Sequence, residues 1–390
     1  MHSEGDRAHT GSRTALLCFL GDVRTDRRVK NFIHVLAADG WHVTLLYAIP
    51  GVDSSAGCEI EGVTVRQLPL QRRQGPWMFW EYDRALRAAL GSIRADLALA
   101  CDLYSLSALA DTKRAQRVLR LFYDSREVYA ELPNVARRLL VKATWTFLER
   151  RALAVTDVVL VTGEQDANEI FRLHSALPRT LLVRNMPLLP GPISPDEAFL
   201  RGLCIPFGKQ VVLYVGGLQE GRGLRQLVEA IRMLDDAVLL LIGRGSIEKE
   251  LKLMAADIPN KVIFAGAIDS ERVLSIAAAC DVGIALVEPI SRSYELALPS
   301  KLFEYKMSGL PVVTSELDQI KKQFGVTDSV EYVSVKDITS LAKSIGYALL
   351  RSKNQEFRES IKEVARAKFH FECDAAAFSS LAEQLLKDSH

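Results

Sequence analysis

The chain has 390 residues and a formal net charge of +1, with 48% hydrophobic and 25% charged residues. This balance is typical of a soluble globular protein, and the length indicates two domains. The near-zero charge excludes a strong general attraction to nucleic acid. No apolar run is long enough to span a bilayer, and the polar first residues lack the apolar core of a signal peptide.

We therefore expect a cytoplasmic protein in which residues 1–12 form a disordered tail. The six cysteines form no CxxC pair and have no zinc-ligand spacing, and the seven histidines are scattered. Buried free thiols and the absence of a metal site are the simplest interpretation.

Short apolar runs alternate with longer helical patterns through the first half of the chain. The runs are continuous rather than alternating, as expected of parallel strands covered on both faces. This pattern predicts a doubly wound, Rossmann-like α/β domain over residues 13–188. The predicted strands are 15–20, 42–48, 97–102, 119–124, 158–162 and 180–185, and a long helix is predicted at roughly 133–154.

The first predicted strand ends in "GDVRTDRRVKN". The dinucleotide fingerprint GxGxxG is absent, which argues against NAD or FAD in this domain. A basic loop at the start of a helix could hold an anion. The alternative is a solvated helix start with an Asp26–Lys30 ion pair, and spacing alone does not decide between them. The cleft candidates here are Gly21, Asp22, Arg24 and Arg28.

Two later strand ends carry carboxylates. Asp102 follows one strand, and Asp124, Arg126 and Glu127 end another. Carboxylates in such positions can bind sugar hydroxyls or act as bases. Alternatively, Asp102 and Ser125 cap the segments that follow, and for Asp102 we favour the capping role.

Five prolines between Pro187 and Pro206 predict an interdomain linker at 189–207. After it the alternation restarts, which predicts a second Rossmann-like domain at 208–370 and a helical C-terminus. Since ligands of such sheets bind at the carboxyl ends of the strands, we expect the site in the cleft between the domains. The predicted strands are 210–217, 237–245, 261–266, 281–288, 311–315 and 330–335.

The stretch "YVGGLQEGRGLRQLVEAI" is more specific. Gly216 and Gly217 let the backbone approach a ligand, and Arg222 precedes the first turn of a helix, where a diphosphate would meet free N–H groups. An ordinary glycine-rich turn is the alternative, and we favour the binding role. Gly243 and Gly245 form a similar but weaker signal.

In "ALPSKLFEYKMSG" we expect Ser300 to be the N-cap of a helix that Gly309 ends. Lys301 then lies at the positive end of the helix dipole, which disfavours a cation. A bound anion would explain the lysine. The alternative is a local salt bridge with Glu304, which is worth little.

Basic and aromatic residues also occur together in two places, "LQRRQGPWMFWEY" and the helix at 133–154. Such surfaces can dock on anionic lipid, although a solvated surface is slightly favoured. The residues concerned are Arg72, Arg73, Trp77, Met78, Phe79 and Trp80, and then Arg137, Arg138, Lys142, Trp145, Arg150 and Arg151.

With these residues assembled, nearly the whole chain resembles the retaining nucleotide-sugar glycosyltransferases of family 4, which have the GT-B fold. "YDSREVYAEL" is similar to the family's "YDSHE" segment, with Arg126 where histidine is common. "LPSKLFEYKMSGLPVV" resembles its donor-site helix and is the most specific match.

The resemblance implies that a sugar is transferred with retention from a nucleotide-diphosphate-sugar donor to a glycan, a lipid-linked precursor or a cell-surface polysaccharide. It implies that Arg222 and Lys301 neutralise the departing diphosphate, that Glu304 binds the ribose, and that neither metal nor cofactor is needed. The acceptor would lie against the first domain, and helix 371–390 would cross back to that domain. The protein could also be peripheral on the inner face of the plasma membrane. The implied donor-binding residues are Gly216, Gly217, Arg222, Gly243, Gly245, Leu298, Pro299, Ser300, Lys301 and Glu304.

Two positions depart from the family pattern. Leu296 stands where the first glutamate of Glu-x7-Glu is usual, and Gly217 stands where the donor loop usually has a basic residue. We infer no loss of activity from these departures, which bear on how the sugar is held. The alternative from another class is a non-transferring GT-B protein, such as a nucleotide-sugar epimerase or a degenerate nucleotide-binding subunit. The lack of histidine in the cleft segments counts against an epimerase, and the presence of Arg222 and Lys301 counts against a degenerate subunit.

Overall fold

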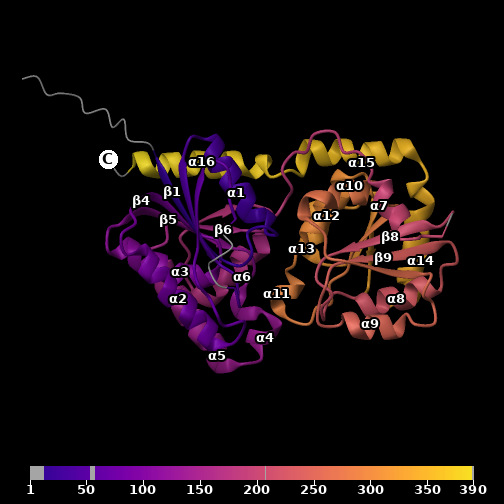
Figure 1. The fold of residues 1–390 in the computed structure, drawn as a ribbon, viewed down its shortest axis with the longest axis horizontal. Helices are drawn as coiled ribbons and strands as arrows, with labels where there is room; N and C mark the ends of the chain where they lie inside the picture. Colours follow the sequence, from indigo (N-terminus) through magenta and orange to yellow (C-terminus); the bar gives the residue numbers. More distant parts are fainter. Residues whose placement is uncertain (1–12, 53–57, 207, 389–390) are drawn as a thin grey trace, which may run out of the picture.

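The computed structural model describes residues 13–52, 58–206 and 208–388, so the tail predicted at 1–12 lies outside the described residues. Two α/β domains lie side by side, and helices cover both faces of each sheet (Figure 1). This is the predicted GT-B architecture of two Rossmann-like domains.

The first domain has a seven-stranded parallel sheet in the order β3-β2-β1-β4-β5-β6-β7. The sequence predicted six of these strands and missed β3, because β3 is a short edge strand whose side chains are mostly half-exposed or exposed. The strands are β1 (Thr14–Leu20), β2 (His42–Ala48), β3 (Val63–Gln67), β4 (Ala95–Ala100), β5 (Val118–Ser125), β6 (Val158–Val161) and β7 (Arg179–Leu182).

The helix predicted at 133–154 is two helices, α4 and α5, because the helical conformation is interrupted at Arg137 and Arg138. The helices of this domain are α1 (Arg27–Ala38), α2 (Pro76–Leu90), α3 (Leu103–Arg114), the 3-10 helix η1 (Tyr129–Glu131), α4 (Pro133–Ala136), α5 (Leu139–Leu153) and α6 (Glu164–His174).

The second domain has a six-stranded parallel sheet in the order β10-β9-β8-β11-β12-β13. All six strands lie where the sequence predicted them. They are β8 (Gln210–Val215), β9 (Ala237–Ile242), β10 (Val262–Gly266), β11 (Val282–Ala285), β12 (Val312–Ser315) and β13 (Val330–Val333).

The segment predicted as a linker contains helix α7 (Glu197–Gly202), whose Phe199 and Leu200 pack against the core of the second domain. The other helices of this half are α8 (Leu224–Arg232), α9 (Glu248–Met254), η2 (Ser270–Arg272), α10 (Val273–Ala278), α11 (Arg292–Glu295), α12 (Ser300–Met307), α13 (Asp318–Phe324), α14 (Ile338–Ser352), α15 (Gln355–Lys368) and α16 (Glu372–Lys387).

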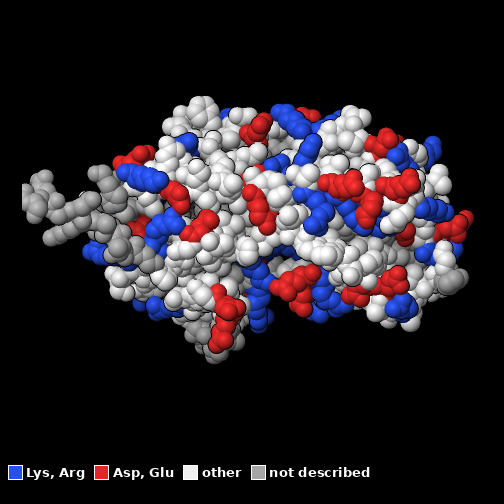
Figure 2. Space-filling model, turned by 90° about the horizontal axis from the view of Figure 1, so that it is seen from above, with Lys and Arg blue, Asp and Glu red and all other residues white. Residues whose placement is uncertain are grey.

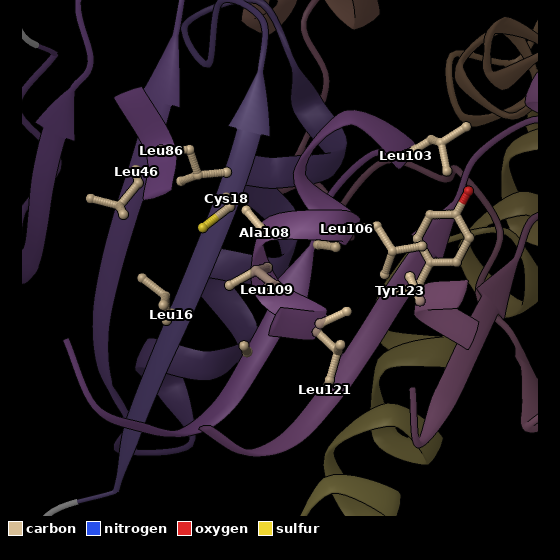
Figure 3. Close-up of a cluster of buried hydrophobic side chains, with 14 of the residues drawn as sticks. Leu16, Cys18, Leu46, Leu86, Leu103, Leu106, Ala108, Leu109, Leu121 and Tyr123 are labelled. Carbon is tan, nitrogen blue, oxygen red and sulfur yellow. The ribbon is translucent and has the colours of Figure 1, made fainter. Parts of the chain in front are cut away.

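Each sheet is buried between two apolar layers. Figure 3 shows one layer of the first domain, where Leu16 and Cys18 of β1 face Leu106 and Leu109 of α3. Such continuous burial explains why the strands read as unbroken apolar runs in the sequence.

The chain crosses between the domains a second time near its C-terminus, where α15 lies over the second domain and α16 over the first (Figure 1). At the crossing the Phe371 N–H donates to the Pro187 carbonyl at 2.7 Å. The rings of Phe371 and Phe378 then pack on Phe32 of α1. On the face seen in Figure 2, acidic and basic side chains are interspersed over both domains.

In both sheets the direction of winding reverses next to the first strand, between β1 and β4 and between β8 and β11. Ligands of doubly wound sheets bind at the carboxyl ends of the strands beside such a reversal. The fold therefore directs attention to the loops after β1, β4, β8 and β11.

Candidate active site

Two adjoining cavities lie between the domains. Cavity 1, of about 350 Å³, lies at the ends of β8, β9 and β10 and is closed by the start of α1. Cavity 2, of about 410 Å³, lies between the ends of β5 and β6 and the segment before α12. The residues that line both cavities are Asn185, Gly216, Ser300 and Lys301.

Helix α12 begins at the boundary between the two cavities. The prediction that Ser300 is its N-cap was wrong: Ser300 is the first helical residue, and the preceding Pro299 has no side chain that can cap. A proline fits there because its φ suits the helix entry. The first N–H groups of α12 therefore have no side-chain cap, and both Ser300 and Lys301 line the cavities. An anion would be stabilised at this position.

Lys301 has no carboxylate partner in the described part of the chain. Its Nζ lies 3.7 Å from the centre of the Tyr214 ring, which is a cation–π contact. Burial lowers the pKa of Lys301, Arg222 lowers it further, and Glu304 opposes the shift. The alternative of a local salt bridge with Glu304 is wrong, because Glu304 pairs elsewhere.

The partner of Glu304 is Arg27 of the first domain, at 2.5 Å between Nη1 and Oε1. The same guanidinium donates to the carbonyl of Ser270. Both residues line cavity 1, together with backbone at Gly243 and Ile268. The carboxylate that would bind a ribose is thus held by an arginine from across the cleft.

Arg222 lines cavity 2 and stacks on the ring of Tyr294 at 4.9 Å. Like Lys301, it has no hydrogen bond or ion pair within the described residues. The sequence predicted free N–H groups at the start of the following helix, α8. One N–H group there is already bonded, however, because the Gly223 N–H donates to Glu288 at 3.1 Å. The anion site therefore belongs to α12 and the two cations rather than to α8.

The glycines have two different roles. Gly216 and Gly217 line the cavities, as do Leu298 and Pro299. Gly243 lines cavity 1, and a Cβ there would lie 1.9 Å from the Gly216 carbonyl oxygen. Gly245 lines neither cavity; a Cβ there would lie 2.0 Å from the Leu218 carbonyl oxygen, so this glycine allows two loops to pack.

Two of the first-domain candidates, Arg28 and Asp124, bind each other in a buried ion pair. Arg28 and Asp124 form a double hydrogen bond at 2.6–3.0 Å with side chains at most 1% exposed. Arg28 touches cavity 1, but its Nη1 is buried with no partner. This pair joins α1 to β5 and so positions the start of α1 at the cleft.

Arg126 stands where the resembled family often has histidine. It lines cavity 2, but its guanidinium binds Asp26 at 2.5 Å and Asp124 at 3.2 Å. Asp26 also caps α1 through the Val29 N–H, so the predicted alternative of an Asp26–Lys30 pair is absent. Arg126 therefore holds the loop after β1 rather than a ligand.

Of the remaining first-domain candidates, one caps a helix and three lie outside both cavities. Asp102 caps α3 and accepts from Leu20, as the favoured interpretation predicted, and burial raises its pKa. Asp22 pairs with the exposed Arg24 at 2.7 Å, and neither they nor Gly21 lines the two cavities.

Glu127 is the remaining candidate of the first domain, and it lines cavity 2. Its side-chain carboxylate has no hydrogen bond or ion pair with any described residue. The surrounding walls of the cleft desolvate it and raise its pKa, while Arg222 and Arg126 oppose the shift.

Several cavity residues were missed from the sequence: Arg27, Asn185, Thr162 and Asp166. Thr162 and Asn185 are the last residues of two predicted strands, so a rule that every polar residue at a strand end is a candidate would have found them. Asp166 lies in the first turn of α6, and nothing local distinguishes it.

Leu296, at the first-glutamate position of the family pattern, is 2% exposed and packs with the core cluster of the first domain. Its carbonyl accepts from Gln319 at 2.6 Å. A charged side chain could not occupy this position without a partner, so the departure from the pattern is a closed apolar contact between domains.

The basic and aromatic patch is smaller than predicted. Met78 is buried, and Phe79 stacks on Tyr104 and meets Trp145 edge-on. Trp77 and Trp80 remain 64% and 57% exposed. The sequence missed three exposed apolar residues of α5: Leu139, Leu140 and Phe147.

Within the described ranges, no three His, Cys, Asp or Glu side chains are grouped as they would be to hold a metal ion. No described helix is long and apolar enough to cross a membrane.

Comparison with known proteins agrees with the fold. Residues 25–186 match the model of a glycosyl transferase 4-like domain, and residues 209–351 match that of glycosyl transferases group 1. The chain therefore belongs to the group 1, family 4 glycosyltransferases, and its fold is GT-B. Among curated proteins, no sequence matches the chain.

The similar solved structures are GT-B glycosyltransferases that share the fold at low identity. The sucrose-phosphate synthase of Thermosynechococcus elongatus is 20% identical with a TM-score of 0.77, over 96% of this chain and 100% of the other. Anabaena HepE, in complex with UDP and glucose, is 15% identical with a TM-score of 0.72, over 94% and 99%. WaaG, a glycosyltransferase involved in lipopolysaccharide biosynthesis, is 16% identical with a TM-score of 0.69, over 96% and 98%.

Proposed function

We propose that this glycosyltransferase moves a hexose-type sugar from a nucleoside-diphosphate donor to a hydroxyl acceptor, with retention of anomeric configuration. One observation carries the donor site: Lys301 and Arg222 face the cleft with no anionic partner among the described residues, beside the uncapped start of α12. Two desolvated cations and a helix N-terminus are stable neighbours only when an anion lies between them.

Lys301 lies at the boundary of the two cavities, which supports a diphosphate position at that boundary. The nucleoside then extends into cavity 1, with its ribose at Glu304, and the sugar extends into cavity 2. That two similar structures, HepE and a trehalose-6-phosphate enzyme of E. coli, hold UDP or a UDP-sugar supports UDP as the first nucleotide to test.

In the reaction, the bond from the anomeric carbon to the phosphate oxygen breaks, and its electron pair stays on the diphosphate. The acceptor oxygen forms the new bond from the same face of the sugar, and its proton passes to the departing diphosphate. Lys301 and Arg222 are the catalytic residues, because they stabilise the charge that grows on the diphosphate. That role supports a reaction with no bound metal or other cofactor.

For the acceptor we propose a glycan, a lipid-linked precursor or a cell-surface polysaccharide, bound on the first-domain side of cavity 2. We further propose a cytoplasmic enzyme that contacts the anionic inner face of the plasma membrane through α2 and α5. These helices pack together through Phe79 and Trp145, and each presents exposed apolar side chains beside arginines.

The test of retention is the configuration of the first product. NMR during the first turnovers, with a donor of known anomer, should show the same anomer in the product. An inverted product would overturn the retaining mechanism while leaving the donor site intact.

The cavities also bear on the alternative of an epimerase. No histidine is present among the residues that line them. The lack of histidine counts against an epimerase, because epimerase sites use histidines as well as carboxylates.

A further inference from the structure

The two walls of cavity 2 differ in chemistry. The wall from the second domain combines the apolar run 296–299 and the rings of Tyr214 and Tyr294 with polar side chains, which are Gln219, Arg222, Ser293, Ser300 and Lys301. The wall from the first domain has no such apolar run and carries Arg126, Glu127, Thr162 and Asp166. A hexose has an apolar ring face and a rim of hydroxyls, so the apolar run suits its ring face and the first-domain wall suits its hydroxyls.

On the first-domain wall, the carboxylates are available to bind a ligand, whereas the arginine is not. Arg126 is bound to Asp26 and Asp124, as described above. The side-chain carboxylate of Glu127 has no hydrogen-bond partner within the described residues, and Glu127 lines the cavity. A carboxylate without a partner in a partly desolvated cleft is costly, and hydroxyl donors from a ligand would compensate for that cost.

Asp166 is the second carboxylate. It is 4% exposed and accepts a hydrogen bond of 2.7 Å from the Thr162 hydroxyl. Burial raises the pKa of Asp166 to about 6. Asp166 and Glu127 both line cavity 2. The Thr162 hydroxyl, oriented by this bond, keeps lone pairs for a ligand.

We propose that Glu127 and the Thr162–Asp166 pair form the subsite that binds the hydroxyl groups of the donor sugar. The ring face then packs on Leu298 and its neighbours. This inference rests on the proposed function, because the diphosphate at Lys301 is what directs the sugar into cavity 2.

The consequence is a division of labour between domains. The second domain holds the nucleotide and the diphosphate, while the first domain recognises the sugar. Glu127 and Asp166 are therefore specificity residues, and they also replace the polar contact that Leu296, packed in an apolar core, cannot make.

The experiment compares the affinity of each nucleoside diphosphate with that of its sugar conjugate, without acceptor. The ligand pairs are UDP with UDP-glucose, GDP with GDP-mannose, and ADP with ADP-glucose. The variants are Glu127→Gln, Asp166→Asn and Thr162→Ala, and Glu164→Gln is the matched control, because Glu164 is exposed on α6 and lines neither cavity. Calorimetry gives the dissociation constants.

We expect the three site variants to bind the diphosphate like wild type but to bind the sugar conjugate about tenfold more weakly, since a lost hydrogen bond to a charged group is worth about that much. The control should match wild type for both ligands. Two conservative variants and a separate threonine variant ensure that one unfolded protein does not end the test.

Three outcomes overturn the inference in distinguishable ways. Unchanged affinity for the sugar conjugate, with normal diphosphate binding, contradicts the subsite alone. A raised acceptor KM in these variants, with unchanged donor affinity, would assign the wall to the acceptor instead. A wild-type protein that binds no nucleoside diphosphate contradicts the proposed function itself, and the subsite with it.

Discussion

Arg27 of the first domain and Glu304 of the second form an ion pair of 2.5 Å across cavity 1, with side chains 19% and 12% exposed. Arg27 also donates to the Ser270 carbonyl, so it bridges two elements of the second domain. Under the proposed function, this guanidinium competes with the donor ribose for the Glu304 carboxylate.

We therefore expect Arg27→Ala to tighten nucleoside diphosphate binding by about threefold to tenfold, because a partly buried pair of this kind is worth about 1 kcal/mol and must break first. Calorimetry measures the change. Lys30→Ala is the matched control, since Lys30 lies one turn along α1 and pairs at 3.5 Å with the mostly exposed Glu271. Weaker binding by Arg27→Ala would instead make Arg27 a nucleotide ligand.

Two lysines of α12 should respond in opposite ways to replacement. Lys301→Ala should lower kcat by about 10²–10³, as expected for a lost transition-state contact. Its melting temperature should be unchanged or slightly raised, because the charge is desolvated and unpaired. Lys306 is 5% exposed and donates to Ser329 at 2.7 Å, so Lys306→Ala should lower the melting temperature and leave kcat nearly intact. The reverse pattern would make Lys301 a structural residue.

Glu304→Ala should act on binding rather than on chemistry. A ribose contact is much the same in the ground and transition states, so its loss raises the dissociation constant and KM with little change in kcat. Steady-state kinetics and calorimetry with the same donor check this. A fall in kcat as large as that of Lys301→Ala would place Glu304 at the reacting centre.

The stability of the protein should depend on pH through Asp166. Its pKa is about 6 in the folded protein and about 4 in an unfolded chain. The folded state binds more protons between these values, so this residue lowers the free energy of unfolding as pH rises from about 4 to 6, and the loss persists above that.

Asp166→Asn removes this penalty, so the variant should gain stability over wild type at pH 7.5 by up to about 3 kcal/mol, and less at pH 4.5. Denaturant unfolding at the two pH values measures it. Asp22→Asn is the control of opposite sign, because the Arg24 hydrogen bond lowers the pKa of Asp22. An equal loss of stability at both pH values would show that Asp166 acts only through its hydrogen bonds.

Membrane contact should depend on the exposed tryptophans of α2. We expect wild type to sediment with anionic liposomes at low salt and to lose binding as salt rises. Trp77→Ser with Trp80→Ser should reduce binding strongly. Leu253→Ser is the control, because Leu253 is 78% exposed on the second domain. No sedimentation of wild type at low salt would contradict the membrane proposal.

The sequence predicted the two sheets because their strands are buried on both faces and read as apolar runs. It missed β3, which is an exposed edge strand, and it merged α4 with α5, because the break at Arg137 carries no proline or glycine signal. Local patterns singled out Lys301, which violates a local rule, and Arg222, which follows a glycine-rich strand end, and both line the cavities. They could not show that Arg28 and Asp124 pair with each other, because that contact joins residues 96 positions apart.

The most direct test of the account is a thermal-shift titration of wild type, Lys301→Ala and Lys306→Ala with UDP, GDP and ADP. A ligand that binds only the folded state at a hundredfold excess over Kd stabilises it by about 2.7 kcal/mol. We predict that at least one nucleoside diphosphate raises the melting temperature of wild type and of Lys306→Ala, and that the rise is largely lost in Lys301→Ala. The absence of any rise in wild type, or an equal rise in Lys301→Ala, would contradict the assignment of the diphosphate site.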